Sequence, residues 1–188
     1  MFEKGISSQT KRNLAVLAKL KFVRRYFLAG GTACALYLGH RLSFDLDWFS
    51  DKPVEPRVIV ANLKDLSFFI YPYPLLFPRH DYAGIKLADI KDIACMKLDA
   101  ISRRGTKRDF IDLYFICKNY RLDYLLELYE QKFAKYNVPV WQAVKSLGYF
   151  AQADENDLPE MLQPVDWNHV KHFFETEAFR LAKSWGIG

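Results

Sequence analysis

The fold is decided by residues 27–50, which read FLAGGTACALYLGHRLSFDLDWFS. The apolar run that enters this stretch, Tyr26–Ala29, predicts a β-strand, and Gly30 and Gly31 end that strand. A short apolar helix pattern then continues to Leu38. Strand, glycine turn and helix follow one another directly, so the stretch predicts a mixed α/β unit in the first part of the chain.

Two carboxylates lie one residue apart on a second predicted strand, Phe44–Phe49. Residues i and i+2 of a strand point to the same face, so Asp45 and Asp47 project together while Leu46 points to the other side. Two like charges side by side raise the free energy unless a cation compensates them, and Mg²⁺ binds one or two carboxylates together with phosphate oxygens. The double glycine lets backbone N–H groups and a helix N-terminus approach a phosphate. The stretch therefore predicts a phosphate and metal site.

The positive charge of the chain is concentrated near its N-terminus. The net charge is +5 over 188 residues. Within the first 25 residues a single acid, Glu3, accompanies seven basic residues: Lys4, Lys11, Arg12, Lys19, Lys21, Arg24 and Arg25. This balance favours a polyanionic partner such as RNA. The alternative is a solvated basic face on a helix that only packs against the core.

Size and composition fit one domain of ordinary size, or one α/β core with a helical extension. At 51% hydrophobic residues the chain can bury a sizeable core. Its three cysteines, Cys34, Cys95 and Cys117, lie far apart in apolar runs and indicate buried thiols in a reducing compartment. An apolar run of about 18 residues, which a membrane span requires, does not occur. We therefore expect a cytoplasmic protein with no membrane partner.

The remaining pattern is mixed α/β first and all-helical afterwards. Ser7 or Ser8 caps an opening helix, and Asp89 caps a helix that reaches about Ser102. Prolines at positions 72 and 74 cannot lie in a central strand, so the segment there is an edge or a wall. The other expected elements are a helix at 58–66, strands at 67–70 and 84–87, and helices at 109–119, 122–135, 140–150 and 167–184.

A second group of charged residues lies where these two halves join. Lys97 interrupts an otherwise apolar helix, and Asp109 and Asp112 are three residues apart on the next helix, so both carboxylates lie on one face. Four cations crowd the turn between the two helices: Arg103, Arg104, Lys107 and Arg108. The alternative is that Asp109 is only the N-cap and Asp112 a first-turn acid. Together with the glycine turn and the paired carboxylates, however, these are the parts that phosphoryl transfer needs.

Two long stretches carry a resemblance to a known family. They are residues 29–50, AGGTACALYLGHRLSFDLDWFS, and residues 92–115, DIACMKLDAISRRGTKRDFIDLYF. In this order they resemble the AbiEii/AbiGii-type toxin nucleotidyltransferase family, within the polymerase-β-like nucleotidyltransferase superfamily. The segment at 162–167, LQPVDW, also resembles the C-terminal region of that family.

The resemblance implies roles for the first stretch. Gly30, Gly31 and Thr32 occupy the turn that holds the incoming nucleoside triphosphate (NTP). Asp45 and Asp47 bind the catalytic Mg²⁺, with Mn²⁺ as a second option. The implied reaction agrees with the residue chemistry: a hydroxyl attacks the α-phosphate and pyrophosphate leaves.

The resemblance also implies roles for the second stretch. Lys97 reaches the nucleotide phosphates, and Asp109 and Asp112 form the second signature of the family, preceded here by Lys107. Some members of the family are toxins that transfer nucleotides to the 3′ end of tRNA. An antitoxin protein is commonly encoded beside them.

One departure from the superfamily pattern concerns a third carboxylate, which often follows the paired acids on a later strand. Residues 66–74, LSFFIYPYP, contain no acid. Either Asp112 supplies this group, or activity is reduced. Two further cations, Arg41 and Arg104, are candidate nucleotide ligands. For Arg41 the alternative is an ion pair with Asp45 or Asp47.

The expected fold is therefore α/β (α+β): a polymerase-β-like core with a small mixed sheet at 1–88, then a helical region at 89–188 that completes the active-site cleft. The expected function is Mg²⁺-dependent transfer of a nucleotide from an NTP to an acceptor hydroxyl, with the tRNA 3′ end as acceptor, by the toxin of a toxin–antitoxin or abortive-infection system. The alternatives are transfer to a small molecule or a protein, or a catalytically weak protein that retains the fold and binds nucleotide or RNA.

Overall fold

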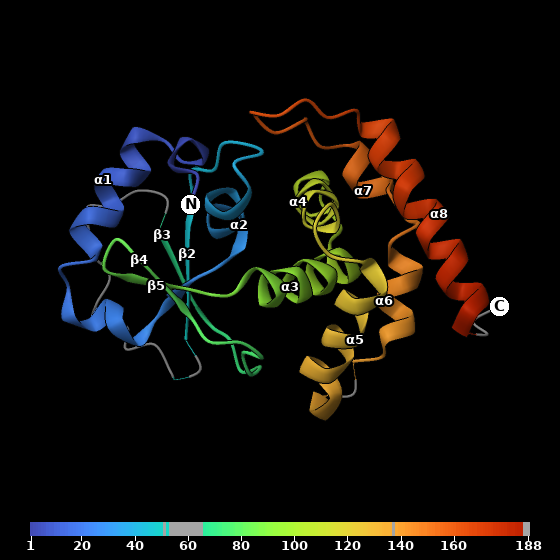
Figure 1. Ribbon diagram of the computed structural model, residues 1–188, viewed down its shortest axis with the longest axis horizontal. Coiled ribbons are helices and arrows are strands. Elements are labelled where there is room, and N and C mark those ends of the chain that lie inside the picture. The colour runs from blue at the N-terminus through green and yellow to red at the C-terminus, as the bar shows by residue number, and fades with distance from the viewer. Residues whose placement is uncertain (51, 53–65, 137, 186–188) are drawn as a thin grey trace. The chain divides into compact units, whose positions relative to one another are not determined.

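A computed structural model describes residues 1–50, 52, 66–136 and 138–185. The chain forms two compact units, Met1–Ile93 and Ala94–Gly188. Figure 1 shows that the first unit mixes strands and helices and that the second is helical. This order of elements confirms the expected α/β fold class with a helical C-terminal region.

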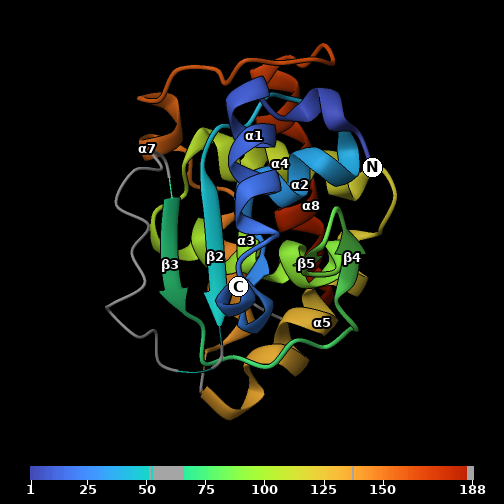
Figure 2. The same cartoon turned by 90° about the vertical axis from the view of Figure 1, so that its left-hand side faces the viewer.

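The first unit is built on a mixed sheet, which among the described residues has five strands in the order β3-β2-β1-β5-β4. The strands are β1 (Phe27–Leu28), β2 (Leu46–Ser50), β3 (Leu66–Ile70), β4 (His80–Tyr82) and β5 (Ile85–Leu87). β1 pairs antiparallel with β2 and parallel with β5, and β2 pairs parallel with β3, as Figure 2 shows for the latter pair. β3 lies at the edge of this sheet, as the prolines that follow it predict.

The sheet buries different aromatic residues on its two faces. Trp48 is fully buried and stacks on Phe68 with the ring centroids 6.3 Å apart. On the opposite face, Phe27 stacks on its cross-strand partner Phe49 at 6.0 Å, and Phe49 stacks on Phe69 at 5.3 Å. Because side chains alternate along a strand, the Phe49 face is also the face of Asp47, two residues earlier on β2.

The opening helix forms as the sequence predicts. Helix α1 spans Ser8–Leu17, and the Ser7 hydroxyl caps it by accepting a hydrogen bond from the backbone N–H of Thr10 at 3.0 Å. Its apolar stripe is buried, with Leu17 fully inaccessible. In Figure 2 α1 lies over the sheet face that is turned toward the viewer. Short 3-10 turns, Glu3–Gly5 and Lys21–Arg25, flank α1 on either side.

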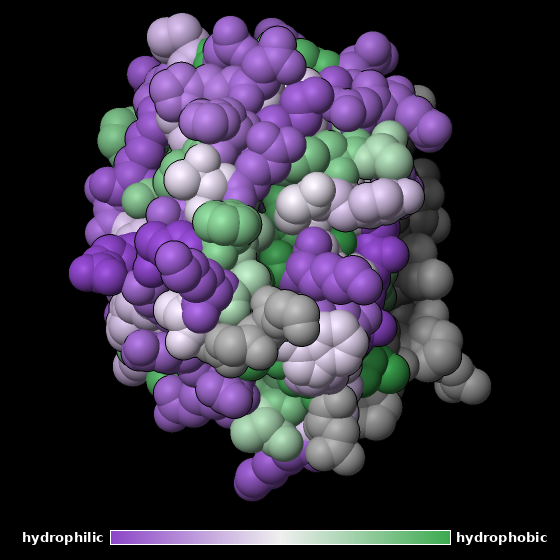
Figure 3. All heavy atoms as spheres, turned by 90° about the vertical axis from the view of Figure 1, so that its right-hand side faces the viewer, coloured by the Kyte–Doolittle hydropathy of each residue, from purple (hydrophilic) through white to green (hydrophobic). Residues whose placement is uncertain are grey.

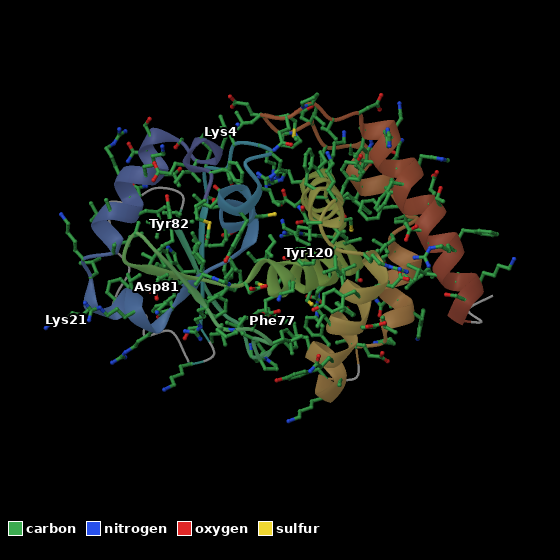
Figure 4. The ribbon with its side chains drawn as sticks, viewed as in Figure 1. Lys4, Lys21, Phe77, Asp81, Tyr82 and Tyr120 are labelled. Atoms are coloured by element: carbon green, nitrogen blue, oxygen red, sulfur yellow. The ribbon has the colours of Figure 1, made fainter. Side chains whose placement is uncertain are left out.

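A β-hairpin formed by β4 and β5 is the element that the sequence does not predict. Only an extended piece at 84–87 is expected there, without a partner strand. The two strands pair antiparallel across Ala83 and Gly84, whose φ angles are +47° and +80°. Positive φ at both central residues is the conformation that tight hairpin turns require. Asp81 and Tyr82 mark β4 in Figure 4.

The helices that follow begin near their expected positions. Helix α3 spans Ile90–Arg103, and the Asp89 carboxylate caps it by accepting from the backbone N–H of Lys91 at 2.9 Å. The next helices are α4 (Lys107–Cys117), α5 (Leu122–Phe133), α6 (Val140–Ser146), α7 (Ala151–Asp154) and α8 (Trp167–Trp185). The expected single helix at 140–150 is wrong in its second half, because α6 ends before Gly148 and α7 starts anew at Ala151. The expected helix at 58–66 lies outside the described residues, except for Leu66, which begins β3.

The core of the helical unit centres on Phe110 of α4. Its ring contacts those of Phe150, Phe174 and Trp167 at centroid distances of 5.0, 5.5 and 6.0 Å.

Figure 3 shows hydrophilic residues surrounding a narrower hydrophobic area on the side of the molecule at the right of Figure 1. Within the described residues, no helix combines the length and the apolar character that crossing a bilayer requires.

Candidate functional site

The first candidate cluster forms where β1 passes into helix α2 (Gly30–Leu38). The N-cap residue of α2 is Ala29, whose methyl group cannot accept a hydrogen bond from the first turn. Gly30 has a φ of +65°, and a Cβ added to it would lie 2.9 Å from Oδ2 of Asp47. The Asp47 carboxylate therefore lies directly against the start of the helix. The positive end of the helix dipole stabilises negative charge there, whether from the carboxylate or from a phosphate.

The absence of a side chain at Gly31 likewise allows Arg41 to lie close to the backbone. A Cβ at Gly31 would lie 2.6 Å from Nη2 of Arg41 and 3.2 Å from the Ser43 hydroxyl. Arg41 is only 3% exposed, and its Nη1 donates to the backbone carbonyl of Leu42 at 3.0 Å. The two glycines thus admit one acidic and one basic side chain to the first turn of α2.

Thr32 holds the segment that leads into β2. Its hydroxyl donates to the backbone carbonyl of Asp45 and is hydrogen-bonded to the Ser43 hydroxyl at 2.9 Å. Thr32 is 1% exposed, whereas Asp45 is exposed and Asp47 half-buried. β2 begins at Leu46, two residues later than predicted, so Asp45 directly precedes the strand. Leu46 between the two acids is buried. That Asp45 and Asp47 project together to the other face stays a prediction.

Gly30 provides a test of this arrangement. We expect Gly30→Ala to lower the free energy of unfolding by about 1–2 kcal/mol, because a residue with a Cβ is strained at positive φ and meets Asp47. Urea denaturation would measure the change. Gly148→Ala is the matched control, because a Cβ there meets its nearest atom only at 3.9 Å, in ordinary van der Waals contact. Equal stability of the two variants would contradict the close packing of Gly30 on Asp47.

The second candidate cluster lies in the helical unit, around the ammonium group of Lys97. Lys97 Nζ is 2.9 Å from Oδ1 of Asp109 and 2.7 Å from Oδ2 of Asp112. The predicted i, i+3 spacing therefore does place both carboxylates on one face, where they meet the same cation. Lys97 is 6% exposed, Asp109 1% and Asp112 0%. Buried charges of this kind persist only when they are paired, and here one lysine serves two acids.

Two further groups bind Asp109. Arg104 Nε lies 3.2 Å from Oδ2, and the Thr106 hydroxyl donates to the same oxygen at 2.7 Å. Burial alone would raise the pKa of Asp109, but the charges of Lys97 and Arg104 and the hydrogen bonds from Thr106 and Lys97 outweigh it and lower the pKa to about 2. Asp109 is thus ionised throughout the neutral range.

This shift predicts how stability depends on pH. The folded pKa lies below the unfolded value of 3.8, so the stabilisation by Asp109 is fully present above about pH 4 and is lost as the pH falls through about 2. Its size is about 2 kcal/mol. We expect Asp109→Asn to be less stable than the wild type at neutral pH, with a difference that shrinks toward pH 2. Urea denaturation across this range measures it, and Asp157→Asn, which changes an exposed acid, should show no such trend.

The structure contradicts the alternative that Asp109 is only the N-cap of α4. Thr106, not Asp109, occupies the N-cap position, and Asp109 is the third residue of the helix. Asp112 lies beyond the first turn. The signal for Thr106 is present in the sequence, since Thr-x-x-Asp before an apolar run resembles a capping box. Because Asp109 binds the side chains of Lys97 and Arg104 as well, its role is more than a cap.

Lys107 makes a different set of contacts from Lys97. Its ammonium donates to the backbone carbonyl of Asn156 and lies 5.3 Å above the ring centroid of Trp167. The backbone N–H of Lys107 donates to Oδ1 of Asn156 at 3.2 Å. Lys107 is 8% exposed. Its contacts with Asn156 connect the start of α4 to the segment after α7. Its predicted contact with the nucleotide stays a prediction.

The structure therefore gathers the predicted site residues into two groups. The first unit brings together Gly30, Gly31, Thr32, Arg41, Asp45 and Asp47. The second brings together Lys97, Arg104, Asp109 and Asp112. Ser43 and Thr106 join these groups as supporting residues that are not among the predicted site residues. Hydroxyl partners at such separations depend on the tertiary fold, so Ser43 has no local signal.

The fold of this chain resembles that of a solved protein. A crystal structure described as a "putative nucleotidyltransferase from H. pylori" is similar, with a TM-score of 0.53, and the match covers 95% of this chain and 96% of that one. Its sequence is 19% identical, so this likeness establishes the fold. It confirms the expected nucleotidyltransferase core.

The family follows from the sequence comparisons. The model of the family "Nucleotidyl transferase AbiEii toxin, Type IV TA system" matches residues 52–182. The chain belongs to this AbiEii family of nucleotidyl transferase toxins from type IV toxin–antitoxin systems, as its resemblance predicted. The match contains the Lys97 cluster and begins after Asp47. The uncharacterized protein aq_aa25 of Aquifex aeolicus (strain VF5) is 34% identical over 197 residues, covering 90% of this chain and 94% of that protein.

Proposed function

We propose that this protein transfers a nucleotide from an NTP to an acceptor hydroxyl at the 3′ end of tRNA, in a reaction that depends on Mg²⁺. The observation that carries the proposal is the Asp47 carboxylate packed against Gly30 at the N-terminus of α2. This pairing supports the proposal because a carboxylate can bind a metal ion and a helix N-terminus can bind a phosphate. Membership in a family of nucleotidyl transferase toxins supports the reaction type.

The residues of the first cluster fit a divalent metal ion. Asp45 and Asp47 offer hard carboxylate oxygens at alternate positions, one just before β2 and one within it, and Asp45 is exposed to solvent. Mg²⁺ prefers such oxygens and completes its shell with water and phosphate oxygens, and Mn²⁺ accepts the same ligands. When bound, the metal supplies Lewis-acid stabilisation of charge on the phosphate oxygens.

The other residues of this cluster would bind the triphosphate. Backbone N–H groups of the first turn of α2, at Gly30 and Gly31, face the position where a phosphate gains most from the helix dipole. Arg41, beside Gly31, adds a positive charge. The acceptor oxygen attacks the α-phosphorus, the bond from that phosphorus to the bridging oxygen breaks, pyrophosphate leaves, and the acceptor hydroxyl loses its proton.

We propose that the Lys97 cluster serves the same reaction. Two carboxylates hold Lys97 Nζ in one place, which is how a cation aimed at a phosphate is kept in position without reorganisation. Asp112 remains our candidate for the third acid that residues 66–74 lack. Its contact with Lys97 at 2.7 Å supports an ionised carboxylate, the form that accepts a proton.

Surface charge supports RNA as the acceptor. All seven basic side chains in the first 25 residues are exposed. Figure 4 shows the labelled Lys21 side chain pointing away from the ribbon. Exposed lysine and arginine side chains of this kind bind phosphates of a nucleic acid backbone and make binding sensitive to salt. The toxin family supports an antitoxin as a further partner of the system.

The test is transfer of label from NTPs to RNA. Each of the four NTPs, labelled at the α-phosphate, is incubated with the protein, Mg²⁺ and total RNA, and the RNA is then separated by size. We expect label in tRNA with α-labelled but not γ-labelled NTP, and none with EDTA or with the Asp45→Ala/Asp47→Ala variant. Label in protein or in small molecules would correct the acceptor. NTP binding without any transfer would contradict catalysis and leave a nucleotide-binding protein.

A further inference from the structure

The two acids of the first cluster are held by different parts of the structure. Asp47 lies within β2, where it is the partner of Ser67 on β3, and its backbone carbonyl accepts from the N–H of Ala29 at 3.2 Å. Pairing within a sheet fixes the path of a backbone, so Asp47 is held from both sides. β2 begins at Leu46, so Asp45 lies outside the strand and its position depends on other contacts.

The hydroxyl of Thr32 provides such a contact. Thr32 is the third residue of α2, and its side chain is buried. The hydroxyl donates to the backbone carbonyl of Asp45, and the Ser43 hydroxyl oxygen is a second acceptor for the same donor at 2.9 Å. One hydrogen shared between two acceptors forms a three-centre bond. Thr32 thus joins the start of α2 to two residues of the segment that precedes β2.

Ser43 is anchored through its backbone as well. Its N–H donates to the carbonyl of Gly5 at 2.9 Å, in the first 3-10 turn, which the labelled Lys4 marks in Figure 4. That turn packs closely on α2, since a Cβ at Gly5 would lie 2.5 Å from the carbonyl oxygen of Ala35. Both the backbone and the side chain of Ser43 are therefore fixed relative to α2, and Ser43 gives Thr32 a firm second partner.

These contacts bear on the chemical role of the Thr32 hydroxyl. The family resemblance places Thr32 in the turn for the triphosphate, where a hydroxyl would donate to a phosphate oxygen. A hydroxyl has a single hydrogen to donate, and in Thr32 the Asp45 carbonyl and the Ser43 oxygen share it. The geometry therefore favours a link to the backbone of Asp45 over a contact with phosphate.

We propose that Thr32 is a positioning residue for the divalent metal ion and acts through the backbone of Asp45. Its bond to the Asp45 carbonyl fixes this residue relative to Asp47, which the sheet holds. Loss of a group that orients metal ligands typically lowers metal affinity about 10–100-fold. The inference rests on the proposed function, because it takes Asp45 and Asp47 to bind the metal ion.

Binding of Mn²⁺ to the whole chain tests this without requiring turnover. Mn²⁺ takes the place of Mg²⁺, and electron paramagnetic resonance of the free ion gives its Kd. Thr32→Val and Thr32→Ala both remove the hydroxyl, and the alanine variant places no methyl group against the Asp45 carbonyl. Thr32→Ser keeps the hydroxyl. Urea denaturation shows which variants are folded.

Thr10→Val is the matched control. Thr10 is also buried, and its hydroxyl donates to the backbone carbonyl of Phe44, one residue before Asp45, at 3.1 Å. The variant therefore loses the same kind of bond in the same segment, but not the bond to the residue that carries the carboxylate. Calorimetric titration of all these proteins with inorganic tripolyphosphate in EDTA reports on phosphate binding separately from metal binding.

We expect Thr32→Val and Thr32→Ala to raise the Kd for Mn²⁺ about tenfold, while Thr32→Ser and Thr10→Val keep the wild-type value. Binding of tripolyphosphate should be the same in all these proteins. Wild-type affinity for Mn²⁺ in a folded Thr32→Val or Thr32→Ala overturns the inference, and so does an equal loss in Thr10→Val, which would indicate a general loosening of the segment.

Two further outcomes separate the inference from the proposed function. Weaker tripolyphosphate binding in Thr32→Val with unchanged Mn²⁺ affinity would overturn the inference and assign the hydroxyl to phosphate. If the wild type binds Mn²⁺ with the expected dependence on Thr32 but transfers no nucleotide, the proposed function fails and the positioning role stands. A wild-type protein that binds no Mn²⁺ overturns the metal site of the proposed function, and the inference with it.

Discussion

Replacement of Asp47 by asparagine is expected to lower kcat for nucleotide transfer about a thousandfold, with little change in stability. Asparagine keeps the size of the side chain against Gly30, where an added Cβ would come within 2.9 Å of Oδ2, but removes the charge that a divalent metal requires. Loss of one preorganised group that stabilises the transition state typically lowers kcat by about 10²–10³, and loss of a metal ligand falls at the upper end. Steady-state kinetics with the NTP identified by the labelling experiment measures the change.

Asp81→Asn is the matched control for Asp47→Asn. Asp81 is an exposed acid on β4 that pairs with Lys86 at 2.7 Å, so the variant changes the same functional group in the same unit. Its kcat should equal that of the wild type. Thermal denaturation should show that both variants remain folded, since Asp47 is half-buried and asparagine has nearly the same size and shape. A wild-type kcat in Asp47→Asn would contradict the proposed role of this residue in binding a metal ion.

Replacement of Lys97 by methionine is expected to lower the free energy of unfolding by about 3–5 kcal/mol. The change leaves Asp109 and Asp112 buried beside one another without the cation that lies within 2.9 Å of both. Buried carboxylates that lose a neighbouring cation take up protons more readily, so the folded pKa values of Asp109 and Asp112 rise in the variant. The destabilisation is then smallest at acidic pH and grows as the pH rises, and urea denaturation at several pH values measures this.

Two companions to Lys97→Met separate charge from packing. Lys97→Met combined with Asp109→Asn and Asp112→Asn removes both buried carboxylate charges together with the lysine and should recover part of the stability at neutral pH. Lys171→Met removes a partly exposed lysine that pairs with Asp154 at 3.2 Å, and pairs of this kind contribute less than about 1 kcal/mol. If Lys97→Met and Lys171→Met destabilise the protein equally, the buried cluster does not depend on its central cation.

Local periodicity carried most of what could be predicted about the fold. Asp89 and Ser7 could be predicted as caps because capping is a local interaction. The side chain bonds a backbone N–H only two or three residues away, so the contact does not depend on the tertiary structure. The i, i+3 spacing of Asp109 and Asp112 is equally local, and both do meet Lys97. The β4–β5 hairpin was missed because its strands have only three residues each, too short for an alternating pattern to stand out.

Contacts between distant segments lay beyond the sequence. The family resemblance implied a place for Thr32 in a phosphate-binding turn, but its bonds to Ser43 and Asp45 depend on how the chain returns from α2 to β2. Lys107 looked equivalent to Arg104, since both are cations of one turn. Only the packing of α4 separates the two, because it directs Lys107 to Asn156 and Arg104 to Asp109.

The packing of Arg41 on Gly31 has a consequence for mutational libraries of this protein. The space that a side chain at position 31 would need is filled by the guanidinium of residue 41, 2.6 Å from where the Cβ would lie. In a library that varies both codons together, the Gly31→Ala change should survive selection mainly in clones that carry a shorter residue at position 41, and those clones should also have lost the positive charge. The effects of substitutions at positions 31 and 41 on fitness are thus non-additive. A scan that changes one position at a time would show that Gly31 cannot be replaced, although the cause is the contact between the two residues.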